Sequence, residues 1–108
     1  MANLASTTDR INGLLDRIER GDYPERARLE ETLTDGYAWA LELDAECGRL
    51  ERRISANAEL LAQESSEERA RELAALARLL THRRRERDAL RNLLVALRSG
   101  AAQEARVA

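Results

Sequence analysis

Arginines gather in one short stretch of the chain, directly after its only histidine, His82. Five residues make up this Arg cluster: Arg83, Arg84, Arg85, Arg87 and Arg91. Guanidinium groups bind phosphate through paired, charge-assisted hydrogen bonds, so the cluster is compatible with binding RNA, DNA or a nucleotide. The formal net charge of the chain is −2, which gives no overall field toward nucleic acid or acidic lipid. Phosphate binding would therefore depend on this local patch.

The Arg cluster has a second interpretation, an internal belt of ion pairs. If the chain folds back on itself, the stretch that faces the cluster carries four acidic residues, Glu42, Asp44, Glu46 and Glu51. Arg83 and Arg87 fall on an apolar stripe, where burying an unpaired guanidinium is costly. Their side chains must extend to facing carboxylates, to solvent or to carboxylates of another chain. The sequence favours the internal belt and keeps nucleic-acid binding as the alternative.

The residues that bind metals or perform catalysis do not form a recognisable site. Cys47 and His82 are expected to lie near each other, but metal sites in helical bundles use a Glu-x-x-His motif, which this chain lacks. There is also no glycine-rich phosphate loop and no nucleophile with a matching base. We therefore expect no enzyme, no metal site and no cofactor. A single cysteine forms no internal disulfide, in agreement with a reducing compartment.

The aromatic residues are few, and two of them lie close together in sequence. Trp39 and Tyr37 are compatible with a stacking platform for bases or for a peptide. Trp39 is also expected to lie beside Leu93, and that pair is too apolar for an exposed edge. We therefore assign Trp39 to the core and leave the role of Tyr37, next to Arg91, open.

The elements that position these residues are helices. Ala, Glu, Leu and Arg fill 69 of the 108 positions, a composition typical of coiled coils and long helices. Two apolar runs keep a three-four spacing, one from Leu29 to Leu61 and the other from Leu73 to Leu97. Such a spacing predicts helices that pack lengthwise against each other. The fold class is all-α, with a long antiparallel helical hairpin of the coiled-coil type.

Capping signals set the expected bounds of three helices in one domain, residues 1–108. A short helix over residues 6–20 starts at Ser6 or Thr7 and stops at Gly21. The second, over residues 23–62, starts with a capping box of Asp22 and Glu25. The third, over residues 66–99, starts with a capping box of Ser65 and Glu68. Gly100 ends it, and the tail of residues 100–108 is expected to be disordered.

The hairpin register follows from a turn near Glu64. Antiparallel folding then pairs positions whose numbers sum to about 130, which brings together the pairs Ile54 and Leu76, Leu50 and Leu80, Ala40 and Leu90, and Leu33 and Leu97. The same register places Glu30 beside Arg98 and Asp44 beside Arg84, with opposite charges. Gly36 falls on the core stripe and predicts a close approach of the helix backbones.

The first helix is expected to cover one flank of the hairpin at its open end only. Leu60 and Leu79 lie on the uncovered continuation of that flank, so the sequence predicts a homodimer that packs into a helical bundle, or a heterodimer through the same surface. Leu60, Leu79, Arg83 and Arg87 are the candidate partner-binding residues. The expected function is a non-catalytic adaptor, scaffold or small helical chaperone. No signal peptide or membrane segment is recognisable, which predicts a cytoplasmic protein.

Overall fold

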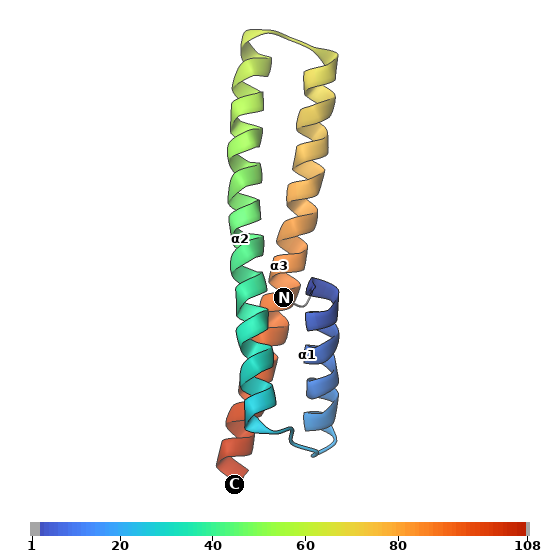
Figure 1. Cartoon of the computed structure of the whole chain (residues 1–108). Helices are drawn as coiled ribbons and strands as arrows, with labels where there is room; N and C mark the ends of the chain where they lie inside the picture. The colour runs from blue at the N-terminus through green and yellow to red at the C-terminus, as the bar shows by residue number, and fades with distance from the viewer. Residues whose placement is uncertain (1–2, 108) are drawn as a thin grey trace. The chain divides into compact units, whose positions relative to one another are not determined.

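Three helices make up the structure, a computed structural model that describes residues 3–107, with side chains as far as residue 103. They are α1 (Leu4–Glu19), α2 (Arg26–Gln63) and α3 (Glu67–Val107) (Figure 1). No strand occurs within residues 3–107. The all-α class and the packing of the two long helices against each other are confirmed, whereas supercoiling of the coiled-coil type stays a prediction.

The start of α1 differs from the sequence expectation, and its end agrees with it. Asn3 is the N-cap, and its side-chain oxygen accepts a hydrogen bond from the Ser6 amide at 2.7 Å. Thr7, expected near the cap, is instead fully buried. At the other end Gly21 adopts a φ of 79°, the left-handed conformation that terminates helices and favours glycine.

The starts of α2 and α3 depend on other residues than those expected. Asp22 forms an ion pair with Arg17 and does not cap α2, which begins only at Arg26. For α3, the hydroxyl of Ser66 accepts a hydrogen bond from the Arg69 amide at 3.3 Å. The two predicted capping boxes are therefore wrong, because the side chains that would close them have other partners or lie one position away.

α3 also continues beyond the predicted stop at Gly100. This glycine is buried and keeps the helix unbroken as far as Val107. A Cβ atom placed on Gly100 would lie 3.0 Å from Cδ1 of Ile18, so the residue permits a close approach of α1 to α3. The predicted end of the third helix at residue 99 is therefore wrong, because this glycine serves packing and not termination. The expected disorder of residues 100–108 stays a prediction, and Ala108 lies outside the described residues.

The chain divides into two compact units. Unit 1 comprises Met1–Leu41 and Asp88–Ala108, and unit 2 comprises Glu42–Arg87. Unit 1 thus contains α1, the first part of α2 and the last part of α3, whereas unit 2 contains the remainder of the two long helices and the turn that joins them. The expectation of a single domain stays a prediction.

Unit 1 is a three-helix arrangement with one apolar core (Figure 1). Each helix contributes fully or nearly fully buried side chains to it: Ile11 and Leu14 from α1, Leu29 and Ala40 from α2, and Leu90, Leu94 and Leu97 from α3. Gly36 lies where these helices meet, since a Cβ atom there would clash with the side chain of Leu94 and contact that of Ile11 at 3.5 Å. Gly36 thus leaves room for the side chain of Leu94, and the predicted close approach of the helix backbones stays a prediction.

Unit 2 is a two-helix arrangement, in which α2 and α3 run side by side to the turn (Figure 1). Its buried cluster contains Cys47 and Leu50 from α2 and Leu76 and Leu80 from α3. Ile54 and Leu79 pack against that cluster and are only partly buried. The packing of these residues agrees with the predicted register, in which position numbers sum to about 130.

A variant of Gly36 tests the close approach in unit 1. We expect Gly36→Ala to destabilise the fold by about 1–3 kcal/mol, because the added methyl group overpacks the contact with Leu94. Gly13→Ala is the control: its Cβ meets open space, so it should stabilise α1 by about 0.5–1 kcal/mol. Urea denaturation followed by circular dichroism measures both. A Gly36→Ala protein as stable as the parent would contradict the assigned packing.

Candidate functional site

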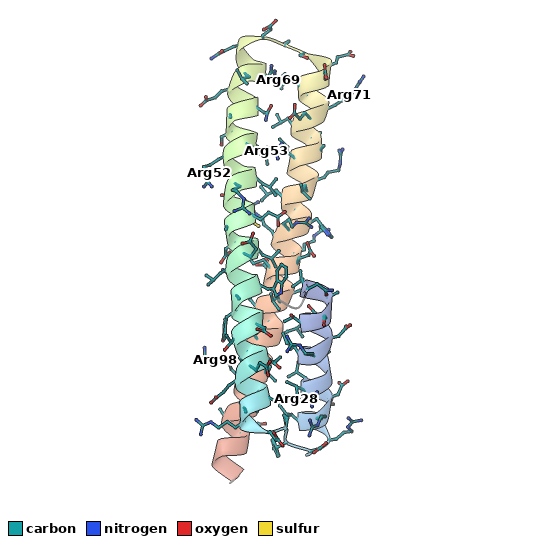
Figure 2. The ribbon with its side chains drawn as sticks, viewed as in Figure 1. Arg28, Arg52, Arg53, Arg69, Arg71 and Arg98 are labelled. Carbon is teal, nitrogen blue, oxygen red and sulfur yellow. The ribbon has the colours of Figure 1, made fainter. Side chains whose placement is uncertain are left out.

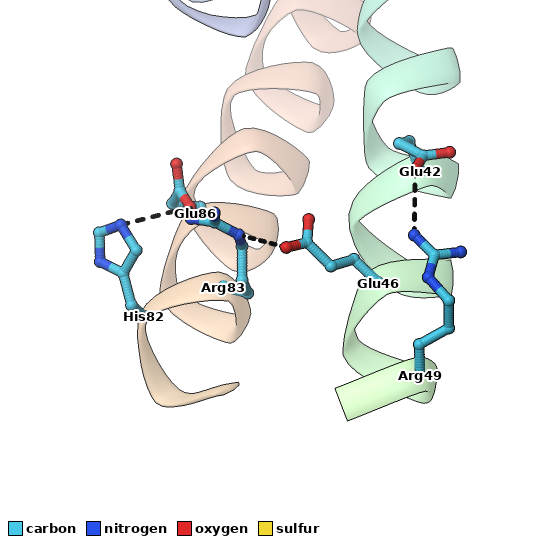
Figure 3. A network of polar contacts seen from close by, with 6 residues as sticks. All are labelled: Glu42, Glu46, Arg49, His82, Arg83 and Glu86. Carbon is cyan, nitrogen blue, oxygen red and sulfur yellow. Dashed lines mark hydrogen bonds and ion pairs between the residues drawn. The ribbon is translucent and has the colours of Figure 1, made fainter. Parts of the chain in front are cut away.

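Arg83 is the centre of a network of charges in unit 2. Its Nε donates a hydrogen bond to Oε1 of Glu46 on α2 at 2.7 Å, and its Nη1 donates to Oε1 of Glu86 at 2.7 Å (Figure 3). All three side chains are about 30 % exposed, so the network is half-buried. These two hydrogen bonds, the one to Glu46 first, raise the pKa of Arg83 above its usual value. Arg83 therefore stays charged and joins the two helices of unit 2.

The neighbours of this network are more exposed. Nε2 of His82 lies 3.4 Å from Oε1 of Glu86, with the histidine side chain 65 % exposed. On α2, Nη2 of Arg49 donates to Oε1 of Glu42 at 3.2 Å, one turn away from Glu46 (Figure 3). His82 thus contacts a carboxylate at the surface of unit 2.

Two further arginines of the Arg cluster pair with acidic residues of α2. Nη2 of Arg84 donates to Oε1 of Glu51 at 2.9 Å, and Nη1 of Arg87 donates to Oδ1 of Asp44 at 3.4 Å. The predicted pairing of Asp44 with Arg84 is therefore wrong: Arg84 pairs with Glu51, which lies about two turns further along α2 than Asp44. Arg83 and Arg84 are consecutive, so they project about 100° apart around α3. Their ion pairs lie on different sides of the apolar seam.

The remaining two arginines are exposed. Arg85 makes no ion pair with any of the described residues, and Arg91 lies in unit 1. Of the cluster, Arg83, Arg84 and Arg87 thus form the internal belt that the sequence favours. Binding of nucleic acid by the cluster stays a prediction, with much of the charge near these three residues already matched by carboxylates.

The two leucines proposed as partner-binding residues differ in exposure. Leu60 is 46 % exposed near the end of α2. Leu79 is half-buried, because it packs against the cluster of Cys47, Leu50, Leu76 and Leu80. Leu60 therefore has more apolar surface available to another molecule than Leu79 has.

The aromatic residues lie in unit 1. Trp39 is half-buried there, and Tyr37 is 39 % exposed. The hydroxyl of Tyr37 accepts a hydrogen bond from Nη1 of Arg98 at 3.2 Å. Glu30, the expected neighbour of Arg98, instead forms an ion pair with Arg26 one turn away on α2 at 3.0 Å. The flank contact between α2 and α3 in unit 1 thus involves a phenol and not the expected carboxylate.

Metal-binding groups and membrane-spanning helices are both absent from the described residues. Within the described part of the chain, no group of three or more His, Cys, Asp or Glu side chains is arranged to hold a metal ion. Cys47 is a free, buried thiol in the apolar cluster of unit 2. None of the helices is both long and apolar enough to cross a membrane over the residues described.

Two ion pairs of unit 1 were missed by the sequence analysis. Nη2 of Arg10 donates to Oδ2 of Asp35 at 2.6 Å, joining α1 to α2. Arg17 donates from Nε and Nη2 to the two oxygens of Asp22, at 3.0 and 3.3 Å. The sequence did indicate that Arg10 and Arg17 share one side of α1, because they are seven residues apart.

Comparisons with known proteins give this chain no relative. No family model, no curated protein and no solved structure matches it.

A double-mutant cycle measures the coupling of Arg83 to Glu46. We expect a coupling free energy of about 1 kcal/mol from Arg83→Met, Glu46→Gln and the double variant, because the pair is half-buried and charge-assisted. The more exposed pair of Arg84 and Glu51 is the matched control and should give about 0.5 kcal/mol or less. Urea denaturation supplies the four unfolding free energies of each cycle. Equal coupling in both cycles would contradict a special role for Arg83.

The ion pair of Arg17 and Asp22 predicts a dependence of stability on pH. Its hydrogen bond to Arg17, followed by the attraction of that charge, lowers the pKa of Asp22 below the usual 3.8. A lowered pKa in the folded state stabilises the fold above pH 3.8, and the effect is lost as the pH falls through the lower, folded-state pKa. Asp22→Asn should therefore lower the thermal midpoint at neutral pH and lose its effect in acid.

The exposed Asp16 provides the control for this measurement, because no such pair forms at its side chain among the residues described. Asp16→Asn should leave the difference between neutral and acidic midpoints close to that of the parent. Thermal scans at a series of pH values compare the three proteins. An Asp22→Asn effect that is constant with pH would exclude the assigned cause.

Proposed function

We propose that this chain is a non-catalytic protein-interaction module, an adaptor, scaffold or small helical chaperone, that acts through helix-to-helix packing. The observation that carries this proposal is the thin apolar core of unit 2. Four residues form its buried cluster, while Ile54 and Leu79 are only partly buried and Leu60 is 46 % exposed. A pair of helices covers one stripe of each helix and leaves the flanks available to a partner.

Energetics supports a partner for unit 2. Small structures bury a low fraction of their surface, and the buried cluster of unit 2 contains only four residues. Cys47 is a free thiol, and no metal-binding group is found over the described positions. Further apolar burial at Leu60 and Leu79 would therefore add stability that the two helices lack by themselves.

The partner that we propose is a second copy of this chain. Two hairpins that meet through the flank of Leu60 and Leu79 form a four-helix bundle, the usual way in which two-helix units complete a core. The network of Arg83, Glu46 and Glu86 presents both signs of charge beside an apolar seam. Charges at the edge of such an interface select the register of the partner helices and add little affinity.

Leu60→Glu tests this proposal with little damage to the fold, because its side chain is 46 % exposed. We expect the variant to dissociate into monomers at concentrations where the parent is a dimer, with at least a tenfold rise in Kd, since a carboxylate would be buried without a partner. Ala58→Glu is the matched control: it adds the same charge at an exposed position about 200° around α2. Sedimentation equilibrium measures the molar mass of all three proteins.

Three outcomes contradict the proposal in different ways. A monomeric parent at every concentration excludes the homodimer. A dimer that both glutamate variants weaken equally excludes the flank of Leu60. Nucleic acid that co-purifies with the chain and dissociates steeply with salt favours the alternative function of the Arg cluster.

A further inference from the structure

A groove in unit 1 lies between α1 and the first part of α2. Its volume is about 720 Å³. Four arginines are among the residues that line it: Arg10, Arg17, Arg20 and Arg28. Arg28 projects from α2 (Figure 2), and the other three belong to α1 or to its C-cap. Asp9 is the one acidic residue in the lining.

The groove is rich in arginine, although it belongs to a unit with an excess of acidic residues. Acidic residues outnumber arginines in unit 1 as a whole. With Asp35 and Asp22, which pair with Arg10 and Arg17, the groove has four guanidinium groups and three carboxylates, so one positive charge is left in excess to attract an anion.

Two of the four guanidinium groups are already fixed in place. Arg10 is held by Asp35 on α2 and Arg17 by Asp22 after α1. In addition, Nε of Arg10 is buried and has no hydrogen-bond partner in the structure. Arg20 and Arg28 form no ion pair with the residues described, so their donors are available to a ligand.

Gly13 supplies an independent observation. It lies in the middle of α1, where glycine costs about 1 kcal/mol relative to alanine. A Cβ atom at Gly13 would have nothing within 4 Å, so packing does not require the glycine. The same residue lines the groove. A glycine that destabilises its helix without a packing reason fits a place where a ligand lies against the backbone.

We propose that this groove binds a small molecule through a diphosphate group. Guanidinium groups match phosphate oxygens, and two that form no ion pair are those of Arg20 at the end of α1 and Arg28 in the first turn of α2. Arg17 adds its Nη1, which its hydrogen bonds to Asp22 do not use. The positive end of the α2 dipole favours an anion there and offsets the opposite field from the end of α1. The part of the ligand beyond the phosphates lies over Gly13.

The groove is longer than one phosphate. Arg10 and Arg20 are ten residues apart on α1, which corresponds to about 15 Å along a helix. A diphosphate has more acceptor oxygens than inorganic phosphate, so it is the better match for a groove lined by more than one guanidinium group. Asp9 repels a second anion at the Arg10 end, so the uncharged part of the ligand belongs there.

Titration of the full-length protein with inorganic phosphate, pyrophosphate and ADP tests the proposal. Nitrogen-proton NMR spectra report shifts at the amides of residues 10–28 and at the arginine Nε–H groups. We expect pyrophosphate and ADP to bind at least tenfold more tightly than phosphate. The double variant Arg20→Glu with Arg28→Glu should weaken both by at least tenfold. Arg52→Glu with Arg53→Glu makes the same change in net charge in unit 2 and should leave binding within about twofold.

Gly13→Leu separates the two sources of a diphosphate. The leucine fills the groove without a change in charge and should keep the thermal midpoint at or above that of the parent. If it weakens ADP and spares pyrophosphate, the ligand is a nucleoside diphosphate or a similar molecule. If both bind equally in the parent and the variant, the ligand is a free oligophosphate, and the proposal holds for the phosphate site alone.

The proposal fails if none of the three anions shifts the groove signals at millimolar concentration. It also fails if the charge reversal in unit 2 weakens binding as much as the reversal in the groove, because attraction would then be due to net charge only. Neither result depends on the oligomeric state, so the test is independent of the proposed interaction function.

Discussion

The lengthwise packing of α2 against α3 is the constraint on which the other features of both units depend. In unit 1 it requires Gly36, whose missing side chain leaves room for Leu94. In unit 2 it aligns Cys47 and Leu50 with Leu76 and Leu80. Because an antiparallel register is shared along both helices, these contacts also decide which acidic residues the arginines of α3 can reach. The charged belt is a consequence of apolar packing, not its cause.

The charged belt in turn favours one register of α2 against α3 in unit 2. Arg83 and Arg84 donate to carboxylates of α2 on different sides of the apolar cluster. A shift of one helix by a turn would leave these groups without their partners, and half-buried charges such as Arg83 are costly to leave unpaired. Exposed pairs add little stability by themselves. Their effect is to penalise alternative registers that the repetitive leucines and alanines would otherwise permit.

The sequence was sufficient for the fold class, the order of the helices and the approximate register, because apolar spacing depends only on which side of a helix meets its neighbour. It was insufficient for the helix ends and for individual ion pairs. Asp22 had the spacing of a cap but pairs with Arg17, and Arg84 pairs with Glu51 and not with Asp44. Long side chains select among several partners within reach, and that choice depends on geometry that a register alone does not define. The groove beside Gly13 was missed for the same reason.

Three of the four glycines within helices show how far the role of a helical glycine depends on the structure around it. Gly36 and Gly100 are required by close contacts, with Leu94 and with Ile18 respectively. Gly13 has the same type of position in the sequence, inside a helix and among polar residues, but no neighbouring atom excludes a side chain there. All three weaken their helices by a similar amount. For Gly36 and Gly100, packing compensates for this loss of helix stability. For Gly13, a compensating interaction must come from outside the chain or be absent.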